Sequence, residues 1–241
     1  MKRYLLLSYG IFVYVVSLLT ILYSVGFIGN LLVVRTIDAA ALIPMGPALF
    51  VNIGLLFLFG MQHSGMARKR VSKCHERSSY VLMSCIALII VMALWQPMGG
   101  IIWAVQNQMW SRMIYVVYFA GWILMFYASF LIDHFGLFGM RQAWTAFRRG
   151  YCWGPELKTS GLYRHVRHPI YLGWLLVVWA APIMTVTHLL FAAGTTIYML
   201  VGIHLEERDL TTELPEYEQY KRKVPMLLPS WRKRLRLGPD S

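Results

Sequence analysis

The sequence predicts an all-α polytopic membrane protein with about five to six transmembrane segments. Of its 241 residues, 58% are hydrophobic and the mean hydropathy is +0.53. Only 14% are charged, against about a quarter in a soluble domain. Several apolar stretches reach the roughly 20 residues that cross a bilayer as a helix. We expect a single integral membrane domain over residues 1–241.

Six apolar segments account for the predicted helices. In chain order they cover residues 4–28, 40–61, 79–97, 113–135, 169–182 and 187–205. The first has no small-residue cleavage site after it, so it is expected to stay as a helix and not to be removed as a signal peptide. The fifth is short for a full span, and Pro182 separates it from the sixth by only a few residues. The last two segments are therefore predicted to form a tight helical hairpin.

Basic residues are distributed very unevenly along the chain. All 23 lysines and arginines except Arg35 and Arg112 fall at residues 1–3, 62–78, 136–168 and 206–241. If the six segments alternate in direction, these four stretches share one side of the membrane, and cytoplasmic loops carry such an excess. The pattern predicts that both termini lie in the cytoplasm, and we expect the membrane to be a bacterial inner membrane. The net charge of +12 then serves topology and contact with anionic membrane lipid, and no nucleic-acid partner is expected.

Beyond the sixth segment the chain is polar, first acidic and then basic. This stretch predicts a cytoplasmic helix through Tyr217 and Tyr220 that meets the membrane again near residues 226–231. Residues 1–135 then hold the N-terminal transmembrane helices. Residues 136–229 hold a cytoplasmic loop, the hairpin and the C-terminal helix.

Histidines and acids fall at the predicted cytoplasmic ends of four segments. They are His63, His134, His168 and His204, with Asp133, Glu206 and Glu207 at the same depth. Polar residues gather at every membrane boundary because charges are costly deeper in the bilayer, so one such histidine alone indicates little. Convergence from four segments favours a polar pocket that is open to water-soluble ligands.

RHVRHPIYLG (164–173) opens the fifth segment with a proline. Proline suits the first turn of a helix, and the free N–H groups and positive dipole there suit a carboxylate or phosphate of a ligand. Glu206 and Glu207 project to different sides of their helix, so one suits a ligand cation while the other pairs with Arg164, Arg167 or Arg208. No HxxH or HxxxH pair links the histidines at the segment ends, so no metal site is expected.

Three sequence elements follow one another in the order and spacing of a known pattern. RHPIYLG (167–173), LEERDL (205–210) and EYEQYKRKVPMLLP (216–229) resemble the isoprenylcysteine carboxyl methyltransferase superfamily. QHSGMAR (62–68), ERSSYVL (76–82), HFGLFGMRQ (134–142), PIMTVTHLLFA (182–192) and VGIHLEERDL (201–210) extend the resemblance to the membrane-bound methanethiol S-methyltransferases. The finer resemblance implies methylation of methanethiol to dimethyl sulfide, with S-adenosylmethionine as the cofactor.

The resemblance also implies a cofactor site at the RHP segment and the glutamate helix. Its residues would be Leu157, Lys158, Tyr163, Arg167, His168, Pro169, Tyr171, His204 and Glu207. Both signs of charge suit the carboxylate, ammonium and sulfonium of S-adenosylmethionine, and the soluble fingerprint GxGxxG is absent from the sequence. Residues 197–201, IYMLV, lack the arginine that binds the substrate carboxylate in the carboxyl methyltransferases. That difference favours a small apolar thiol.

Methyl transfer to sulfur is an in-line displacement by a thiolate, so a proton acceptor is expected at the site. Histidine is the usual choice because its pKa lies near neutral pH, and the candidates are His63, His134 and His168. Two other functions stay open. One is a phospholipid or isoprenylcysteine methyltransferase with a lipid acceptor. The other is an NADPH-binding membrane reductase, because sterol-reductase-like proteins carry a related histidine-proline-tyrosine motif.

Overall fold

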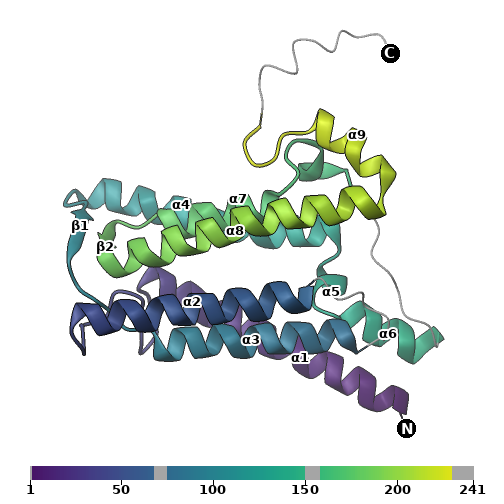
Figure 1. Ribbon diagram of the computed structural model, residues 1–241, viewed down its shortest axis with the longest axis horizontal. Helices are drawn as coiled ribbons and strands as arrows, with labels where there is room; N and C mark the ends of the chain where they lie inside the picture. The colour runs from purple at the N-terminus through teal and green to yellow at the C-terminus, as the bar shows by residue number, and fades with distance from the viewer. Residues whose placement is uncertain (1, 68–74, 150–157, 230–241) are drawn as a thin grey trace.

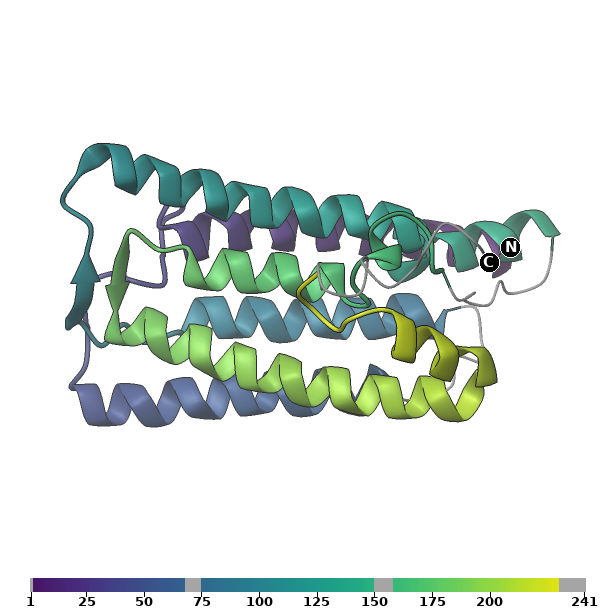
Figure 2. The same cartoon turned by 90° about the horizontal axis from the view of Figure 1, so that it is seen from above.

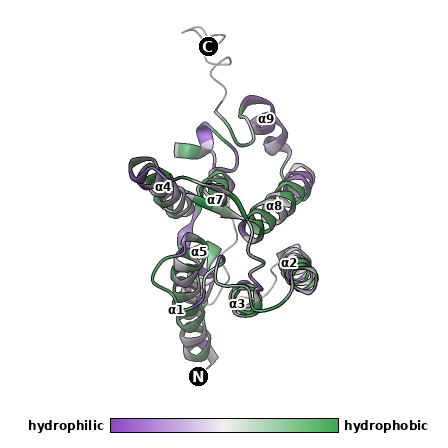
Figure 3. Ribbon diagram, turned by 90° about the vertical axis from the view of Figure 1, so that its left-hand side faces the viewer, coloured by the Kyte–Doolittle hydropathy of each residue, from purple (hydrophilic) through white to green (hydrophobic). Residues whose placement is uncertain are grey.

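In the computed structural model, six helices run side by side in two layers of three (Figure 1). The structure describes residues 2–67, 75–149 and 158–229. One layer consists of α4 (Gln108–Ile132), α7 (Pro169–Trp179) and α8 (Val186–Glu213), and the other of α1 (Lys2–Gly29), α3 (Glu76–Leu94) and α2 (Met45–Ala67). Figure 3, which looks along the helices, shows both layers in cross-section.

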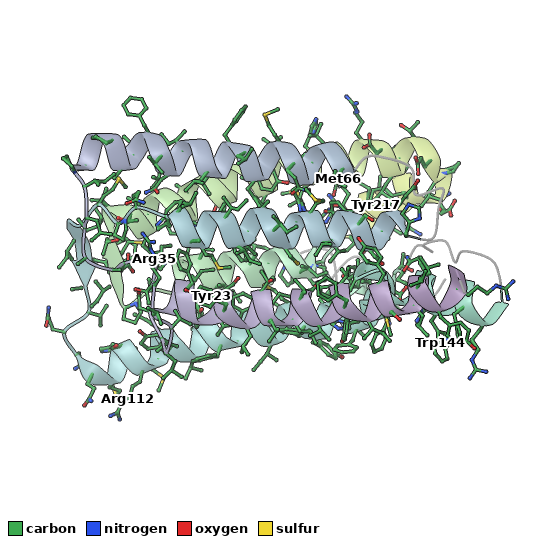
Figure 4. The ribbon with its side chains drawn as sticks, turned by 90° about the horizontal axis from the view of Figure 1, so that it is seen from below. Tyr23, Arg35, Met66, Arg112, Trp144 and Tyr217 are labelled. Carbon is green, nitrogen blue, oxygen red and sulfur yellow. The ribbon has the colours of Figure 1, made fainter. Side chains whose placement is uncertain are left out.

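The two ends of the bundle differ in structure (Figure 2). At one end, β1 (Ile101–Ala104) pairs with β2 (Ile183–Thr185) in an antiparallel ribbon, and we call it the sheet end. The opposite end carries α5 (His134–Leu137), α6 (Met140–Arg149), the 3-10 helix η1 (Gly161–Arg164) and α9 (Pro215–Lys223), and we call it the motif end. In Figure 4, Arg35 and Arg112 lie toward the sheet end, whereas Met66, Trp144 and Tyr217 lie toward the motif end.

All six helices contribute to one apolar core. Its buried residues include Phe27, Leu55, Val91, Tyr118, Val177 and Phe191, one from each helix. Large apolar side chains also cover the outside of the bundle, for example Leu22, Phe57 and Ile123. Within the described residues, five helices are long and apolar enough to cross a membrane, and α7, with 11 residues, is shorter than a full span. The predicted all-α polytopic fold is confirmed.

Two glycines allow α4 and α7 to pack closely. A Cβ atom added to Gly121 would lie 2.8 Å from the carbonyl oxygen of Gly173, and one added to Gly173 would lie 2.7 Å from the carbonyl oxygen of Gly121. Small residues at such a crossing let helix backbones approach within a membrane. Because Gly173 ends the RHPIYLG motif, this contact helps to fix the motif against α4.

The structure corrects several predicted boundaries. The hairpin of α7 and α8 is present as predicted, but its turn contains β2, and the β1–β2 ribbon was not predicted. α8 continues to Glu213, eight positions beyond the predicted end at residue 205, because charged residues can extend a helix beyond the bilayer. α4 begins at Gln108, since the side chain of Asn107 accepts hydrogen bonds from the N–H groups of Met109 and Trp110.

Candidate functional site

The segment that follows α9 holds the turn formed by Arg167, His168 and Pro169, which we call the RHP turn. α7 begins at Pro169 with His168 as its N-cap residue, as the sequence predicts. The backbone N–H of Arg167 donates to the carbonyl of Pro225 at 2.9 Å, and that of His168 donates to the carbonyl of Met226 at 3.1 Å. Two elements of the sequence pattern that lie far apart in the chain are therefore paired through their backbones.

Glu207 lies at the centre of this arrangement. Its Oε1 accepts hydrogen bonds from Nε of Arg167 at 2.7 Å and from Nε2 of His168 at 3.0 Å. Its Oε2 lies 3.3 Å from Nζ of Lys221. The side chains of Arg167 and Glu207 are only 9% and 7% exposed, and a charge buried to this extent requires partners. These contacts tie the RHP turn, α8 and α9 to one carboxylate.

Arg167 also closes the C-terminal end of α9. Its Nη1 donates to the carbonyl of Lys221 at 3.0 Å and to the carbonyl of Val224. Carbonyls at the end of a helix lack partners within the helix, and a cation there is favourable. Arg167 therefore links the RHP turn to the C-terminal helix directly.

Tyrosines connect η1 to α9 and α4. The hydroxyl of Tyr220 donates to the carbonyl of Tyr163, and the hydroxyl of Tyr163 donates to the carbonyl of Ala128 at 3.3 Å. Burial raises the pKa of Tyr220 to about 12 and also raises that of Tyr163. Both hydroxyls therefore keep their protons at neutral pH and act as donors.

The predicted cofactor residues separate into two groups. Tyr163, Arg167, His168, Pro169 and Glu207 belong to the connected set just described. Tyr171 lies on the first turn of α7, and its hydroxyl donates to Oε2 of Glu206 at 3.1 Å.

The remaining predicted cofactor residues are His204, Lys158 and Leu157. His204 is exposed on α8. Lys158 begins the described stretch before η1, whereas Leu157 lies outside the described residues. The role of the whole set in cofactor binding stays a prediction.

A second polar group lies between the two layers, around His63 of α2. Its Nε2 is 2.8 Å from the Tyr80 hydroxyl and its Nδ1 is 3.1 Å from Oγ of Ser84, both on α3. From the opposite layer, the Tyr198 ring on α8 lies 6.3 Å from the imidazole. We call His63, Tyr80, Ser84 and Tyr198 the interlayer group.

His134 lies in a different environment. Its Nε2 is 3.0 Å from the Tyr14 hydroxyl on α1, and its Nδ1 is 2.8 Å from Oγ of Ser129 on α4. The Phe130 ring stacks on it with centroids 4.1 Å apart. Burial holds the pKa of His134 below its usual value, although the carboxylate of Asp133 acts in the opposite direction. His134 and His63 therefore have different hydrogen-bond partners, and a catalytic role for either stays a prediction.

Sequence reasoning missed Tyr80, Ser84 and Tyr198 as site residues. Tyr80 lies in ERSSYVL, one of the stretches that carry the finer resemblance, and Tyr198 is the polar residue within IYMLV. The available signal was the hydroxyl of Tyr198 within an otherwise apolar stretch, which indicates a polar contact inside the bundle. Only the packing of α3 against α2 brings the hydroxyls of Tyr80 and Ser84 to His63. The Tyr198 ring approaches His63 from α8, and its hydroxyl lies 3.1 Å from Oγ of Ser64.

A cavity of about 640 Å³ lies at the sheet end, far from the motif, with Asp38 and His188 among its lining residues. Nδ1 of His188 is 3.1 Å from Oδ2 of Asp38, and its Nε2 is 3.0 Å from the carbonyl of Val178. Thr185 and Asn30 donate further hydrogen bonds to the carboxylate. These contacts fasten the loop between α1 and α2 to the start of α8.

Asp38→Asn is expected to lower the stability of the protein by about 1–3 kcal/mol at neutral pH. Burial alone would raise the pKa of Asp38, but hydrogen bonds from His188 and Thr185 outweigh it and hold the pKa below the ordinary value of 3.8. A depressed carboxyl pKa stabilises the fold above the unfolded pKa, and this contribution is lost as the pH falls through the folded pKa. Melting in detergent at about pH 7 and at successively lower pH measures the effect. The difference between the variant and the wild type is expected to shrink as the pH falls through the folded pKa.

The control for this prediction is Asp209→Asn, the same change at a side chain that is 46% exposed. It is expected to leave the melting temperature nearly unchanged. Equal melting of the Asp38→Asn variant and the wild type near neutral pH would contradict the assigned role of the pair.

Comparisons with known proteins identify the family of the chain. The profile of the isoprenylcysteine carboxyl methyltransferase (ICMT) family matches residues 122–212. The methanethiol S-methyltransferase of Crocosphaera subtropica is 44% identical over 238 residues, covering 95% of this chain and 93% of the relative. That of Mycobacterium tuberculosis is 42% identical over 238 residues, covering 95% and 98%. Nurim from Xenopus laevis is 33% identical over 179 residues, covering 66% and 61%. No solved structure matches.

Proposed function

Because the chain belongs to the family of the methanethiol S-methyltransferases, we propose that it transfers a methyl group from S-adenosylmethionine to methanethiol and releases dimethyl sulfide. The observation that supports this most directly is the convergence on Glu207. The RHP turn, α8 and α9 carry the three elements of the superfamily pattern, and Arg167, His168 and Lys221 bring them to one carboxylate.

The described residues fit S-adenosylmethionine, which supplies an electrophilic methyl group when it binds. The first turn of α7 offers backbone N–H groups for the ligand carboxylate. Glu206 is exposed beside Tyr171 and suits the ligand ammonium. Arg167 and Glu207, which are buried and paired, hold the turn and α8 in position. The remaining members of the proposed cofactor site are Leu157, Lys158, Tyr163, His168, Pro169 and His204.

The motif end is proposed to face the cytoplasm of a bacterium, with the protein in the inner membrane. This orientation follows from the basic residues, nearly all of which lie in the stretches at that end or adjoining it. S-adenosylmethionine is charged and made in the cytoplasm, so a site at this end has access to it. Methanethiol is small and uncharged and reaches the layers from the membrane or from water.

Inverted membrane vesicles that contain the protein are expected to form dimethyl sulfide when methanethiol and external S-adenosylmethionine are added. Right-side-out vesicles are expected to do so only after permeabilisation, because the charged cofactor does not cross the membrane. Gas chromatography of the headspace measures the product, and vesicles without the protein provide the background. An inactive protein that is still thermally stabilised by S-adenosylhomocysteine would contradict the proposed methyl acceptor.

The two alternative functions give different results in the same preparation. When the methyl group of S-adenosylmethionine is isotopically labelled, a lipid methyltransferase would place the label in the lipid extract. A reductase would be stabilised by NADPH and not by S-adenosylhomocysteine. The apolar IYMLV stretch of α8 and the similarity over 95% of the chain both favour the thiol.

A further inference from the structure

α6 packs against the first turns of α1 at the motif end of the bundle (Figure 1). Tyr4 of α1 lies edge-on to Phe147 of α6, with ring centroids 5.1 Å apart. Farther along α1, a Cβ atom added to Gly10 would lie 2.6 Å from the Cβ of Ala143. The two helices therefore run antiparallel and in close contact, which fixes the position of α6.

This pair of helices lies where the apolar part of the bundle ends. α1 has 28 residues, which extend about 42 Å at 1.5 Å per residue. That length exceeds the roughly 30 Å of hydrocarbon in a bilayer. α1 begins with Lys2 and Arg3, whose charges are costly inside the hydrocarbon. The start of α1 therefore reaches the level of the lipid headgroups, and the last turns of α6 lie beside it.

The two faces of α6 differ in composition. The residues buried on the side toward the bundle are Gln142, Ala143 and Ala146. The exposed residues are spaced three and four positions apart, which places them on one face of the helix, and they are Arg141, Trp144 and Arg148. Trp144 is 45% exposed and points away from the bundle in Figure 4. The outer face of α6 is therefore aromatic and basic.

Arg148 is arranged in a way that suits a phosphate. Its guanidinium carbon lies 5.0 Å from the centre of the Trp144 ring. A guanidinium that stacks on an aromatic ring keeps the N–H donors at its edge for phosphate oxygens. Arg3 is exposed as well, and it lies at the same level because Tyr4 contacts Phe147. Neither α1 nor α6 contains an acidic residue that could neutralise these cations.

We propose that Arg3, Trp144 and Arg148, which we call the outer patch, bind the phosphate of an anionic phospholipid such as phosphatidylglycerol. Arg141 lies on the same face, but its Nη2 is 3.0 Å from Oδ1 of Asp133, so it is not assigned to the lipid. Tryptophan is enriched at the headgroup level of membranes, and anionic lipids attract basic residues there. A second copy of the chain would bring like charges to this patch. The inference does not depend on methyl transfer.

Arg148→Gln is expected to weaken the binding of dioleoylphosphatidylglycerol about fivefold, the usual contribution of one basic residue near an anionic surface. Trp144→Leu is expected to weaken it about two- to fivefold, because the indole no longer supports the guanidinium. Native mass spectrometry of the protein in detergent, titrated with the lipid, measures the affinity. Dioleoylphosphatidylcholine has the same acyl chains without the net charge, and it is expected to bind the variants and the wild type equally.

Arg208→Gln and Trp110→Leu are the matched controls. The Arg208 side chain is 70% exposed on α8 at the motif end, and Trp110 is 60% exposed on α4 at the sheet end. Both changes are expected to leave the affinity for phosphatidylglycerol unchanged. A phosphatidylglycerol that carries a diazirine in its headgroup is expected to cross-link to α6 in the wild type and several-fold less in Arg148→Gln. The substituted side chains are exposed, so all variants are expected to melt as the wild type does in phosphatidylcholine.

Several outcomes would overturn the lipid site. Wild-type affinity for phosphatidylglycerol in Arg148→Gln would do so, as would an equal loss in Arg208→Gln, because overall charge would then account for the binding. Cross-links confined to other helices would place the lipid elsewhere. Competition by millimolar inorganic phosphate would show an anion site that needs no lipid. A dimer that forms in the wild type and is lost in Trp144→Leu would instead assign the outer patch to a second copy of the chain.

Discussion

Glu207→Gln is expected to lower the free energy of unfolding by on the order of 3–5 kcal/mol, the usual cost of removing one partner of a buried ion pair. The carboxylate is 7% exposed and faces Arg167, His168 and Lys221. A neutral amide leaves the two cations without a countercharge, and its N–H2 group cannot accept hydrogen bonds. By the usual scaling for a chain of this size, the melting temperature is expected to fall by roughly 6–20 °C.

The same change is expected to abolish stabilisation by S-adenosylhomocysteine and the formation of dimethyl sulfide. Arg167 holds both the RHP turn and the end of α9 only while Glu207 fixes its guanidinium. Without that contact, Arg167 no longer fixes the position of the start of α7 relative to the segment after α9. Thermal melting with and without S-adenosylhomocysteine measures both effects on one sample.

Glu213→Gln is the control for this prediction. It makes the same change at the exposed last residue of α8. It is expected to preserve both the melting temperature and the ligand shift. Wild-type melting and ligand binding in Glu207→Gln would show that the buried pair organises neither the fold nor the cofactor site.

Hydropathy predicted the helices because bilayer thickness fixes how long an apolar run must be. It did not predict where helices end in water. α8 runs through EERDLTTE, whose charged residues continue the helix without being apolar. The β1–β2 ribbon was missed because IIWA and IMT are short apolar runs whose pairing joins residues such as Ile101 and Thr185 across the chain. Local pattern contains no information about such a partner.

The RHPIYLG motif predicted that α7 begins at a polar turn. Because Glu206 and Glu207 are consecutive and project to different sides of their helix, the sequence also predicted that one of them pairs with an arginine. The structure confirms that pairing for Glu207 with Arg167, while Glu206 accepts from Tyr171. Sequence gives only the depth of the histidines in the membrane. Depth does not tell which side of its helix a side chain projects from. This direction decides that His63 contacts Tyr80 whereas His134 contacts Tyr14.

Gly173→Ala is expected to destabilise the protein by about 1–3 kcal/mol, the usual cost of overpacking a tight contact. The new Cβ would lie 2.6 Å from Cγ of Met125, 2.7 Å from the carbonyl oxygen of Gly121 and 3.1 Å from the backbone N of Met125. The Met125 side chain can move aside, but backbone atoms of α4 move only with the helix. The expected relief is therefore a displacement of α7 away from α4, and melting in detergent measures its cost.

Gly54→Ala separates this steric effect from the general effect of adding a methyl group to a glycine in a membrane helix. No atom lies within 4 Å of a Cβ at Gly54 in α2, and alanine is a better helix former than glycine by roughly 1 kcal/mol. This control is expected to melt at or above the wild-type temperature. Because α7 carries both Tyr171 and the RHP turn, Gly173→Ala is also expected to weaken stabilisation by S-adenosylhomocysteine. Lower stability with a fully retained ligand shift would mean that the α4–α7 contact supports the fold without positioning the site.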